Sequence, residues 1–293
     1  MNASSQTNQC VVTGASGYVG GRLKEHLRRA GLPVVDWTRR APSGSDAVPF
    51  QLGQDVAPKQ FAGTTTLVHC AYDFEARKWE EIFGTNVRGS EKLLRAANAG
   101  GVRRIIFISS ISAFDGCRSM YGRAKLEIER LALSLGATVI RPGLVYGDSP
   151  GGVFGGLVRQ VKGSRFVPLL AGGHQRQYLV HDADLGRFVE QCARGIISPP
   201  GKPVTLAHEE GWEMRRLLTS LGEALGKKIS FVPIPWRIAW LGLKTFEAFG
   251  LPTPFRSDSL ISLIYQNAAP SFELAKALNL ECRLFKVTPA MLA

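Results

Sequence analysis

The chain has 293 residues, of which 45% are hydrophobic and 20% charged, so it is long enough to bury a full core and has the composition of a globular protein. Its 36 Lys and Arg against 24 Asp and Glu give a net charge of +12 without any basic run or tail, which argues against nucleic-acid binding and favours a small anionic substrate. No uncharged apolar run reaches the roughly 18 residues of a membrane-spanning helix.

The cysteines are odd in number, widely spaced and without a Cys-x-x-Cys pair. They are Cys10, Cys70, Cys117, Cys192 and Cys282. This pattern is typical of buried free thiols in a reducing compartment. Residues 1–8 are polar and lack a hydrophobic signal segment, so we expect a cytoplasmic protein.

The first structured stretch is an apolar run over residues 9–12, followed by the glycine-rich segment Thr13–Gly20 and a helical pattern to Ala30. Gly14 allows a backbone turn, Gly17 permits close approach of a pyrophosphate, and Gly20 lets the helix pack tightly. The free N–H groups of the helix N-terminus would face the phosphates. This spacing alone leaves phosphate binding and a plain turn equally open.

A second strand over residues 33–38 decides between these readings, because Cys10 to Thr38 spans 29 residues, close to one βαβ unit of a dinucleotide fold. An NAD-preferring site has an acid at the end of this strand, whereas here Thr38, Arg39 and Arg40 follow. Asp36 comes two residues too early and is expected on the strand itself. We therefore expect NADP(H) to be preferred, with NAD(H) as the alternative if the arginines are only a surface pair.

Further along, short strands are predicted over residues 47–50 and 65–68, a long helix over about 76–99 and a strongly β-branched strand over 104–108. We expect His69 to be a hydrogen-bonded polar side chain, since no ligand cluster accompanies it, and we predict no metal. Ser109 and Ser110 follow the last of these strands, at the sheet edge where ligands of such folds bind.

Tyr121 and Lys125 open the next predicted helix, which stops at Gly136. Residues four apart share one helix face, so both side chains can point into the same cleft. A lysine ammonium beside the phenol would lower the pKa of Tyr121 from about 10 and make it an acid or base near neutrality.

With these motifs in order, the chain resembles the extended short-chain dehydrogenase/reductase family, which includes NAD(P)-dependent epimerases, dehydratases and reductases of sugar nucleotides. The resemblance covers about residues 9–185. Five segments carry it: Thr13–Gly20, Thr85–Val87, Ser109–Ser110, Tyr121–Lys125 and Arg141–Gly147. It implies an α/β fold, with a Rossmann-type doubly wound parallel sheet over residues 1–185 and a smaller substrate-binding C-terminal lobe over 186–293. Some of residues 140–185 are open to either part.

The resemblance also assigns roles to individual residues. Tyr121 would be the catalytic acid/base, Lys125 would orient the nicotinamide ribose, Ser110 would position the substrate oxygen, and Asn86 would support the lysine through a water. The expected cofactor-binding residues are Gly14, Ser16, Gly17, Tyr18, Val19, Gly20, Thr38, Arg39, Arg40, Gln51, Leu52, Cys70, Ala71, Tyr72, Tyr121, Lys125, Pro142, Gly143, Leu144 and Val145. The family also suggests a homodimer through the helices over 79–94 and 122–135.

Three departures from the family pattern leave alternatives open. Tyr121 follows Ser110 by only eleven positions, so Ser112 is an alternative catalytic or substrate-contacting serine. Gln51 replaces the usual acid near the adenine. Arg176 matches a phosphate-binding arginine only approximately, so it is either a substrate diphosphate ligand or a surface residue.

Beyond residue 185 the pattern predicts an amphipathic helix over 211–225, a short strand over 228–233 and an apolar, aromatic stretch over 235–249. We expect this last stretch to form core or a lobe interface, with a membrane-surface or lipid-facing role as the alternative.

The predicted reaction is hydride transfer between C4 of a nicotinamide and a carbon bearing a hydroxyl or carbonyl, favouring a nucleotide sugar as substrate. Reductase and epimerase both stay open, and a dehydratase ranks lower because Asp115 is the one carboxylate near the serine. Alternatives are an NADPH-dependent reductase of a hydrophobic, steroid- or isoprenoid-like alcohol or ketone, and a non-enzymatic NADP-binding sensor.

Overall fold

The computed structural model describes residues 9–41, 44–251 and 255–292. The polar segment 1–8, on which the expectation about a signal sequence rests, lies outside the described residues. In the described part, no helix combines the length and the apolar character needed to cross a membrane. All five cysteines are free thiols, but only Cys10 and Cys192 are buried and the other three are partly exposed.

The chain begins with the predicted βαβ unit, whose strands run parallel: β1 (Gln9–Thr13), α1 (Tyr18–Arg29) and β2 (Val34–Thr38). The central sheet adds β3 (Val48–Pro49), β4 (Thr64–His69), β5 (Arg104–Ile108), β6 (Thr138–Pro142) and β11 (Val204–Leu206). Its seven strands lie in the order β11-β6-β5-β4-β1-β2-β3, and every neighbouring pair is parallel. The strand order reverses between β1 and β4, which confirms the predicted doubly wound Rossmann-type sheet.

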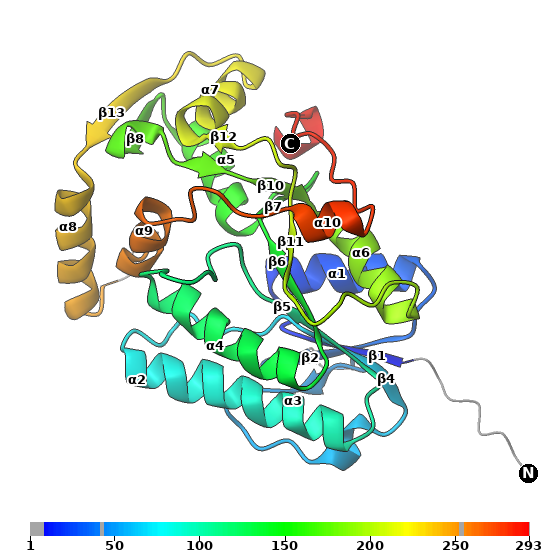
Figure 1. Cartoon of the computed structure of the whole chain (residues 1–293). Coiled ribbons are helices and arrows are strands. Elements are labelled where there is room, and N and C mark those ends of the chain that lie inside the picture. Colours follow the sequence, from blue (N-terminus) through cyan, green and yellow to red (C-terminus); the bar gives the residue numbers. More distant parts are fainter. Residues whose placement is uncertain (1–8, 42–43, 252–254, 293) are drawn as a thin grey trace, which may run out of the picture.

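Helices cover both faces of this sheet (Figure 1). α1 and α6 (Asp182–Arg194) pack on one face, and α3 (Gly89–Ala99) and α4 (Met120–Ser134) lie on the other. A hydrophobic core lies on each face of the sheet, and alternate residues of a strand belong to the two cores, because successive side chains of a strand point to opposite faces. Val12 and Val68 face α1, for example, whereas Val11 and Leu67 belong to the core under α3 and α4.

The long helix expected over 76–99 begins later and is not uniform. It consists of α2 (Trp79–Ile82), the π-helical turn η2 (Phe83–Arg88) and α3. A π-helical turn inserts an extra residue into the helical repeat, and such turns are frequent at functional sites. This one contains the buried Asn86. The residues expected at a homodimer interface, 79–94 and 122–135, lie on α2, η2, the first half of α3 and α4, and the homodimer itself stays a prediction.

A smaller substructure lies beyond the carboxyl ends of the strands, at the top of Figure 1. It is built from pairs of short strands, β10 with β7, β12 with β9 and β13 with β8, together with α5 and α7. Their bounds are β7 (Leu144–Tyr146), α5 (Gly152–Gly163), β8 (Phe166–Leu170), β9 (Arg176–Gln177), β10 (Leu179–His181), β12 (Trp212–Glu213), α7 (Met214–Ala224) and β13 (Ser230–Ile234). Edge-to-face contacts of Phe285 with Tyr146, Phe154 and Trp212 fill its core.

Residue 185, where the boundary between dinucleotide-binding domain and lobe was expected, lies inside α6. α6 packs against α1, and β11 adds a strand to the central sheet beside β6. The chain therefore returns to the sheet after the boundary, and the division into domains stays a prediction.

The last elements are α8 (Trp236–Ala248), α9 (Ser257–Ile264), α10 (Glu273–Ala277) and the short 3-10 turn η4 (Pro289–Leu292). Of the two arrangements expected for residues 235–249, core is wrong, because α8 contains no buried residue, and a lobe interface stays a prediction. Burial within the described part of the chain does not account for its exposed apolar side chains Ile238, Leu241, Phe246 and Phe249.

Candidate active site

The glycine turn joins β1 to α1 at the point where the strand order reverses. Gly14 has a φ of +68°, and a side-chain Cβ there would lie 2.9 Å from the backbone of Ala71. A Cβ on Gly20 would lie 2.3 Å from the Gly14 carbonyl oxygen. Gly20 is thus required by the turn itself, in addition to the helix packing for which it was predicted. Gly17 is the N-cap of α1, so the N-terminus of this helix opens at the turn.

A hydrogen bond between the side chains of Thr13 and His69 connects the ends of β1 and β4. The Thr13 hydroxyl bonds His69 Nδ1 at 2.8 Å and accepts hydrogen bonds from the N–H groups of Cys70 and Ala71. His69 Nε2 bonds the Ser90 hydroxyl at 2.9 Å. Burial, with a smaller effect of the Lys125 charge, lowers the pKa of His69 to about 3. His69 is therefore a neutral, hydrogen-bonded side chain, as the sequence predicted.

The described residues contain no cluster of three or more His, Cys, Asp or Glu able to hold a metal ion.

The end of β2 carries the residues expected to choose the cofactor. Asp36 lies on β2 as predicted, and its carboxylate is bound by Lys24 at 2.9 Å and Arg28 at 2.8 Å. Arg39 is exposed and forms an ion pair with Glu75 at 3.0 Å, and Arg40 is exposed. The Thr38 hydroxyl is buried and has no hydrogen-bond partner within the described part of the chain.

The residues expected near the adenine follow β3. Gln51 is exposed, and its N–H donates to the side chain of Gln54. Leu52 is buried against Gly89, where a Cβ would lie 3.2 Å from the leucine side chain. The structure thus places Leu52 in the core and Gln51 at the surface.

Tyr121 and Lys125 lie on the first turns of α4, as the four-residue spacing predicted. The Lys125 ammonium donates to the Ile108 carbonyl oxygen at 2.8 Å and lies 5.9 Å from the centre of the Tyr121 ring. Burial lowers the pKa of Lys125 to about 8, and Cys70 and Glu129 act in the opposite direction.

The pKa of Tyr121 differs from the sequence-based expectation. Burial raises it to about 12, and a side-chain hydrogen bond with Ser110 acts in the lowering direction. The expected lowering by Lys125 is absent because the ammonium points to the end of β5 and over the rings of Phe107 and Tyr72, at 4.8 and 5.3 Å.

Three serines follow β5 and have different partners. The Ser109 hydroxyl donates to Glu129 at 2.5 Å, and Arg141 binds the same carboxylate, so Ser109 belongs to a buried network under the site. Ser110 is hydrogen-bonded to Tyr121. Ser112 accepts a hydrogen bond from Ser262 of α9 at 3.0 Å. Of the two candidate serines, the structure therefore brings Ser110 to the tyrosine.

Asn86 supports the loop after β4 instead of contacting Lys125 directly. Its side-chain oxygen accepts from the Asp73 N–H at 2.7 Å, and its amide nitrogen donates to the Asp73 carbonyl at 3.0 Å. This loop carries Tyr72 and Phe74, whose rings lie 4.9 and 5.9 Å from that of Tyr121. The water-mediated support of Lys125 stays a prediction.

The segment 142–145, expected at the nicotinamide end, runs beside the serine loop, since the Pro142 carbonyl accepts from the Ile111 N–H at 3.0 Å. Gly143 is required there because a Cβ would lie 2.1 Å from the Tyr178 carbonyl oxygen. Arg176 is an exposed residue of β9, and its backbone carbonyl accepts from Gln266. The structure does not bring Arg176 into contact with Tyr121 or Ser110.

The sequence analysis did not identify two residues of the site. Phe74 is 60% exposed and stacks over Tyr121 with an interplanar angle of 23°. Asp258, on α9, accepts hydrogen bonds from the backbone N–H groups of Met120 and Tyr121 at 2.7 and 3.0 Å. No local pattern marks either residue, because both act on Tyr121 from distant parts of the chain.

Comparisons with known proteins place the chain among known sequences and folds. The model of the "NAD dependent epimerase/dehydratase family" matches residues 10–195. UDP-glucose 4-epimerase of Vibrio cholerae is 28% identical over 261 residues, covering 77% of this chain and 78% of that protein. N-acetyl-alpha-D-glucosaminyl-diphospho-ditrans,octacis-undecaprenol 4-epimerase of Escherichia coli O157:H7 is 22% identical over 264 residues, covering 81% and 78%.

Among solved structures, MoeE5 in complex with UDP-glucose and NAD has a TM-score of 0.68 at 21% identity, covering 92% of this chain and 99% of that one. At this identity the likeness concerns the fold alone. It extends over both the central sheet and the smaller substructure beyond it.

Proposed function

The chain belongs to the NAD dependent epimerase/dehydratase family, and from this we propose that it is an NAD(P)-dependent epimerase acting on a nucleotide sugar. The observation that carries the proposal is the grouping of Tyr121, Ser110 and Lys125 at the carboxyl ends of the central strands, next to the glycine turn. A positioned tyrosine with a serine and a lysine can move a proton to or from a substrate oxygen.

The residues present fit a dinucleotide. Gly14 and Gly20 leave no room for side chains in the turn, and the N-terminus of α1 opens there with N–H groups suited to phosphate. The buried hydroxyl of Thr38, unpartnered among the described residues, lies at the end of β2, where the fold places the adenosine ribose. Gly14, Gly17, Thr38 and Arg39 would hold the adenosine diphosphate half, and Tyr121 and Lys125 the nicotinamide half.

A bound nicotinamide supplies hydride transfer at its C4 carbon. Tyr121 moves the matching proton: it takes the proton of the substrate hydroxyl when that carbon is oxidised and returns it when the carbonyl is reduced. With a pKa of about 12, the form of Tyr121 that prevails at neutral pH is the protonated one, which serves the second of these steps. The positive charge of Lys125 stabilises negative charge that develops on Tyr121 when the proton leaves. Ser110 holds the hydroxyl of Tyr121 by a hydrogen bond and can donate to the same substrate oxygen.

Two observations support a nucleotide sugar as the substrate. The V. cholerae relative, which is similar over most of both chains, is a UDP-glucose 4-epimerase. The net charge of +12 would also attract an anionic diphosphate. A preference for NADP(H) is part of the proposal and rests on Arg39 and Arg40 at the end of β2, and on the engagement of Asp36 by two basic side chains.

The test is incubation of the full chain with UDP-glucose, UDP-N-acetylglucosamine or dTDP-glucose, with NAD or NADP, followed by chromatographic analysis of the sugar nucleotides. We expect epimerisation of at least one of them, and a fall of about 100-fold or more in Tyr121→Phe. Tyr265→Phe is the matched control, because Tyr265 packs on Trp236 outside the site.

Two results would overturn the proposal. Equal activity of Tyr121→Phe and the unmodified chain would remove the tyrosine from the mechanism. NADPH-dependent reduction of a hydrophobic ketone, with no conversion of any nucleotide sugar, would replace the epimerase by the reductase.

A further inference from the structure

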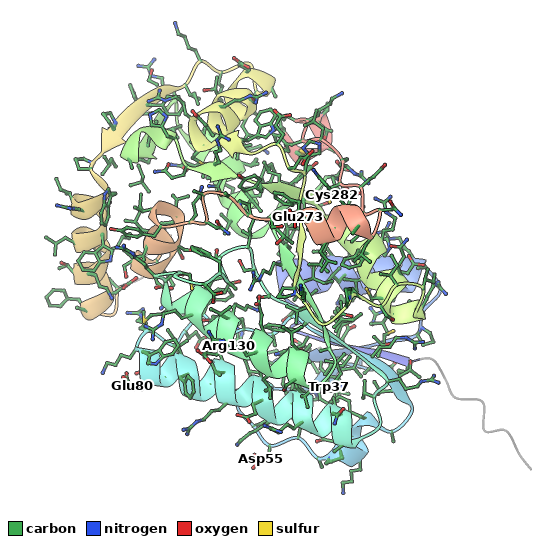
Figure 2. The ribbon with its side chains drawn as sticks, viewed as in Figure 1. Trp37, Asp55, Glu80, Arg130, Glu273 and Cys282 are labelled. Carbon is green, nitrogen blue, oxygen red and sulfur yellow. The ribbon has the colours of Figure 1, made fainter. Side chains whose placement is uncertain are left out.

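α8 lies at the edge of the molecule, on the left of Figure 1, and several of its side chains project away from the molecule in Figure 2. Although most of its residues are apolar, none is buried. Ile238 is 66% exposed, Leu241 62%, Phe246 51%, and Phe249 at its C-cap 76%. Contiguous exposed apolar side chains of this size mark an interaction surface.

The exposed residues share one side of the helix. Ile238, Leu241, Thr245 and Phe249 recur at intervals of three and four residues, the spacing of a single helical face, and the exposed Phe246 lies at the border of that face. The opposite side packs on α9, where the Trp236 ring lies 5.8 Å from that of Tyr265. We call the surface formed by Ile238, Leu241, Phe246 and Phe249 the α8 face.

Basic residues border the α8 face, and the acidic residue of the helix is engaged elsewhere. Arg237 and Lys244 are the two cationic residues of α8. Glu247 faces inward, where its carboxylate accepts hydrogen bonds from the Ser257 N–H and hydroxyl at 2.8 and 2.7 Å. Exposed Arg77 lies beside this end of the helix, since it donates to the Glu247 carbonyl.

This combination matches an anionic lipid surface better than a second copy of the chain. An isologous dimer through the α8 face would gather Arg237 and Lys244 of both copies at one interface, while Glu247 of α8 is already engaged by Ser257. A bilayer surface accepts apolar side chains at the boundary of the headgroups and attracts Lys and Arg with its negative charge. Such docking needs no membrane-spanning helix.

We propose that the α8 face docks the protein on an anionic membrane surface, with Ile238, Leu241, Phe246 and Phe249 entering the headgroup boundary and Arg237 and Lys244 contacting lipid phosphates. Docking would hold the active site close to the bilayer, because α8 packs on α9, and Arg256 at the N-cap of α9 donates to the carbonyls of Phe74 and Ala76 in the loop beside Tyr121. This inference is independent of the reaction proposed above.

The test is co-sedimentation of the full chain with vesicles of phosphatidylcholine alone or mixed with phosphatidylglycerol. We expect binding to the mixed vesicles that weakens as salt is added, and weaker binding to phosphatidylcholine alone. The triple variant Ile238→Ser/Leu241→Ser/Phe249→Ser and the double variant Arg237→Glu/Lys244→Glu should each weaken binding at least tenfold. Unchanged thermal unfolding would show that both variants fold.

Matched controls distinguish binding through the α8 face from nonspecific hydrophobic or electrostatic binding elsewhere on the surface. Ile196→Ser removes an apolar side chain that is 68% exposed, and Lys59→Glu/Lys202→Glu makes the same charge change at exposed sites outside α8. Both should bind like the unmodified chain. Absence of vesicle binding, or equal loss in the controls, would overturn the proposal. A concentration-dependent dimer in sedimentation velocity that the triple variant abolishes would assign the α8 face to a second copy and overturn it as well.

Discussion

The carboxylate of Asp258 accepts a hydrogen bond from the backbone N–H of Tyr121 at 3.0 Å, although 137 residues separate the two in the chain. Its other oxygen accepts from the Met120 N–H at 2.7 Å. An acceptor at these free N–H groups stabilises the helix N-terminus, and this one is supplied by α9. The position of the proposed acid/base is therefore fixed by the C-terminal part of the chain.

Asp258→Ala should lower kcat about tenfold with little change in KM, because the backbone of Tyr121 loses its hydrogen bond to α9. Ser119→Ala is the matched control: the Ser119 hydroxyl caps the same helix at the Gly122 N–H, 3.1 Å away, without linking it to α9. Each variant should lose about 1 kcal/mol of stability. Steady-state kinetics and denaturant unfolding check both effects, and an equal loss of kcat in the two variants would make Asp258 only a structural cap.

Ser110→Ala should lower kcat about 100-fold, because it removes the hydroxyl that bonds Tyr121 and can donate to the substrate oxygen. Ser112→Ala should change kcat less than threefold, since the Ser112 hydroxyl is paired with Ser262. The same sugar-nucleotide assay measures both variants. A larger loss in Ser112→Ala would reverse the assignment of the serine.

Arg39→Ala should weaken NADPH binding about tenfold and leave NADH binding unchanged, because a guanidinium recognises a phosphate through charge-assisted hydrogen bonds. Glu75→Gln should tighten NADPH binding by up to about fivefold, since an exposed ion pair contributes at most about 1 kcal/mol and its loss frees Arg39. Arg130→Ala, an exposed arginine paired with Glu127, is the control. Parallel fluorescence titrations measure the affinities, and equal loss for both nucleotides would contradict the 2′-phosphate interpretation.

Gly20→Ala should lower the free energy of unfolding by about 1–3 kcal/mol and abolish nucleotide binding, because the added Cβ would lie 2.3 Å from the Gly14 carbonyl oxygen. Gly21→Ala, one residue on, meets the Ala15 carbonyl oxygen at an ordinary 3.4 Å. It should keep nucleotide binding and gain up to about 1 kcal/mol from helix propensity. Denaturant unfolding and nucleotide titration distinguish the two. Equal behaviour would show that the turn can relax.

His69 should make the protein less stable as the pH falls below about 6.5. The unfolded chain protonates this histidine there, whereas burial in the folded chain delays protonation to a pKa of about 3. The unfolded state thus binds more protons, and stability falls by about 1.4 kcal/mol per pH unit between these values. Unfolding curves of His69→Asn should lack this slope and run parallel to those of the unmodified chain near pH 8. An identical slope at acid pH would exclude His69 as its source.

Local patterns predicted the N-terminal half of the fold closely. β5 has the predicted bounds because a β-branched run lies between the helix-ending Gly100–Gly101 and a pair of serines. The π-helical turn around Asn86 could not be predicted, since its residues have the same apolar spacing as an ordinary helix. α8 shows what composition cannot predict. An apolar pattern indicates a face that avoids water, but it does not show whether other residues of the same chain bury that face.

The sequence predicted only some of the residues of the candidate site. Tyr121 and Lys125 follow from spacing along one helix. The pKa of Tyr121 was expected to be lowered and is raised, because burial exceeds the effect of a lysine whose ammonium is turned toward the Ile108 carbonyl. Asp258 could not be found, since its role depends on how distant segments pack. The assigned cofactor-binding residues stay predictions until binding is measured.

The order in which the sheet is completed bears on synthesis of the chain. β6 pairs on one side with β5 and on its other side with β11. β11 comprises residues 204–206, and 61 residues separate it from β6 in the chain. An emerging chain therefore exposes the unpaired edge of β6 while α5 to α6 are still being made, and such an edge can pair with other chains. Fragments that end before residue 204 should aggregate during translation, whereas fragments that include β11 should be protected at this edge.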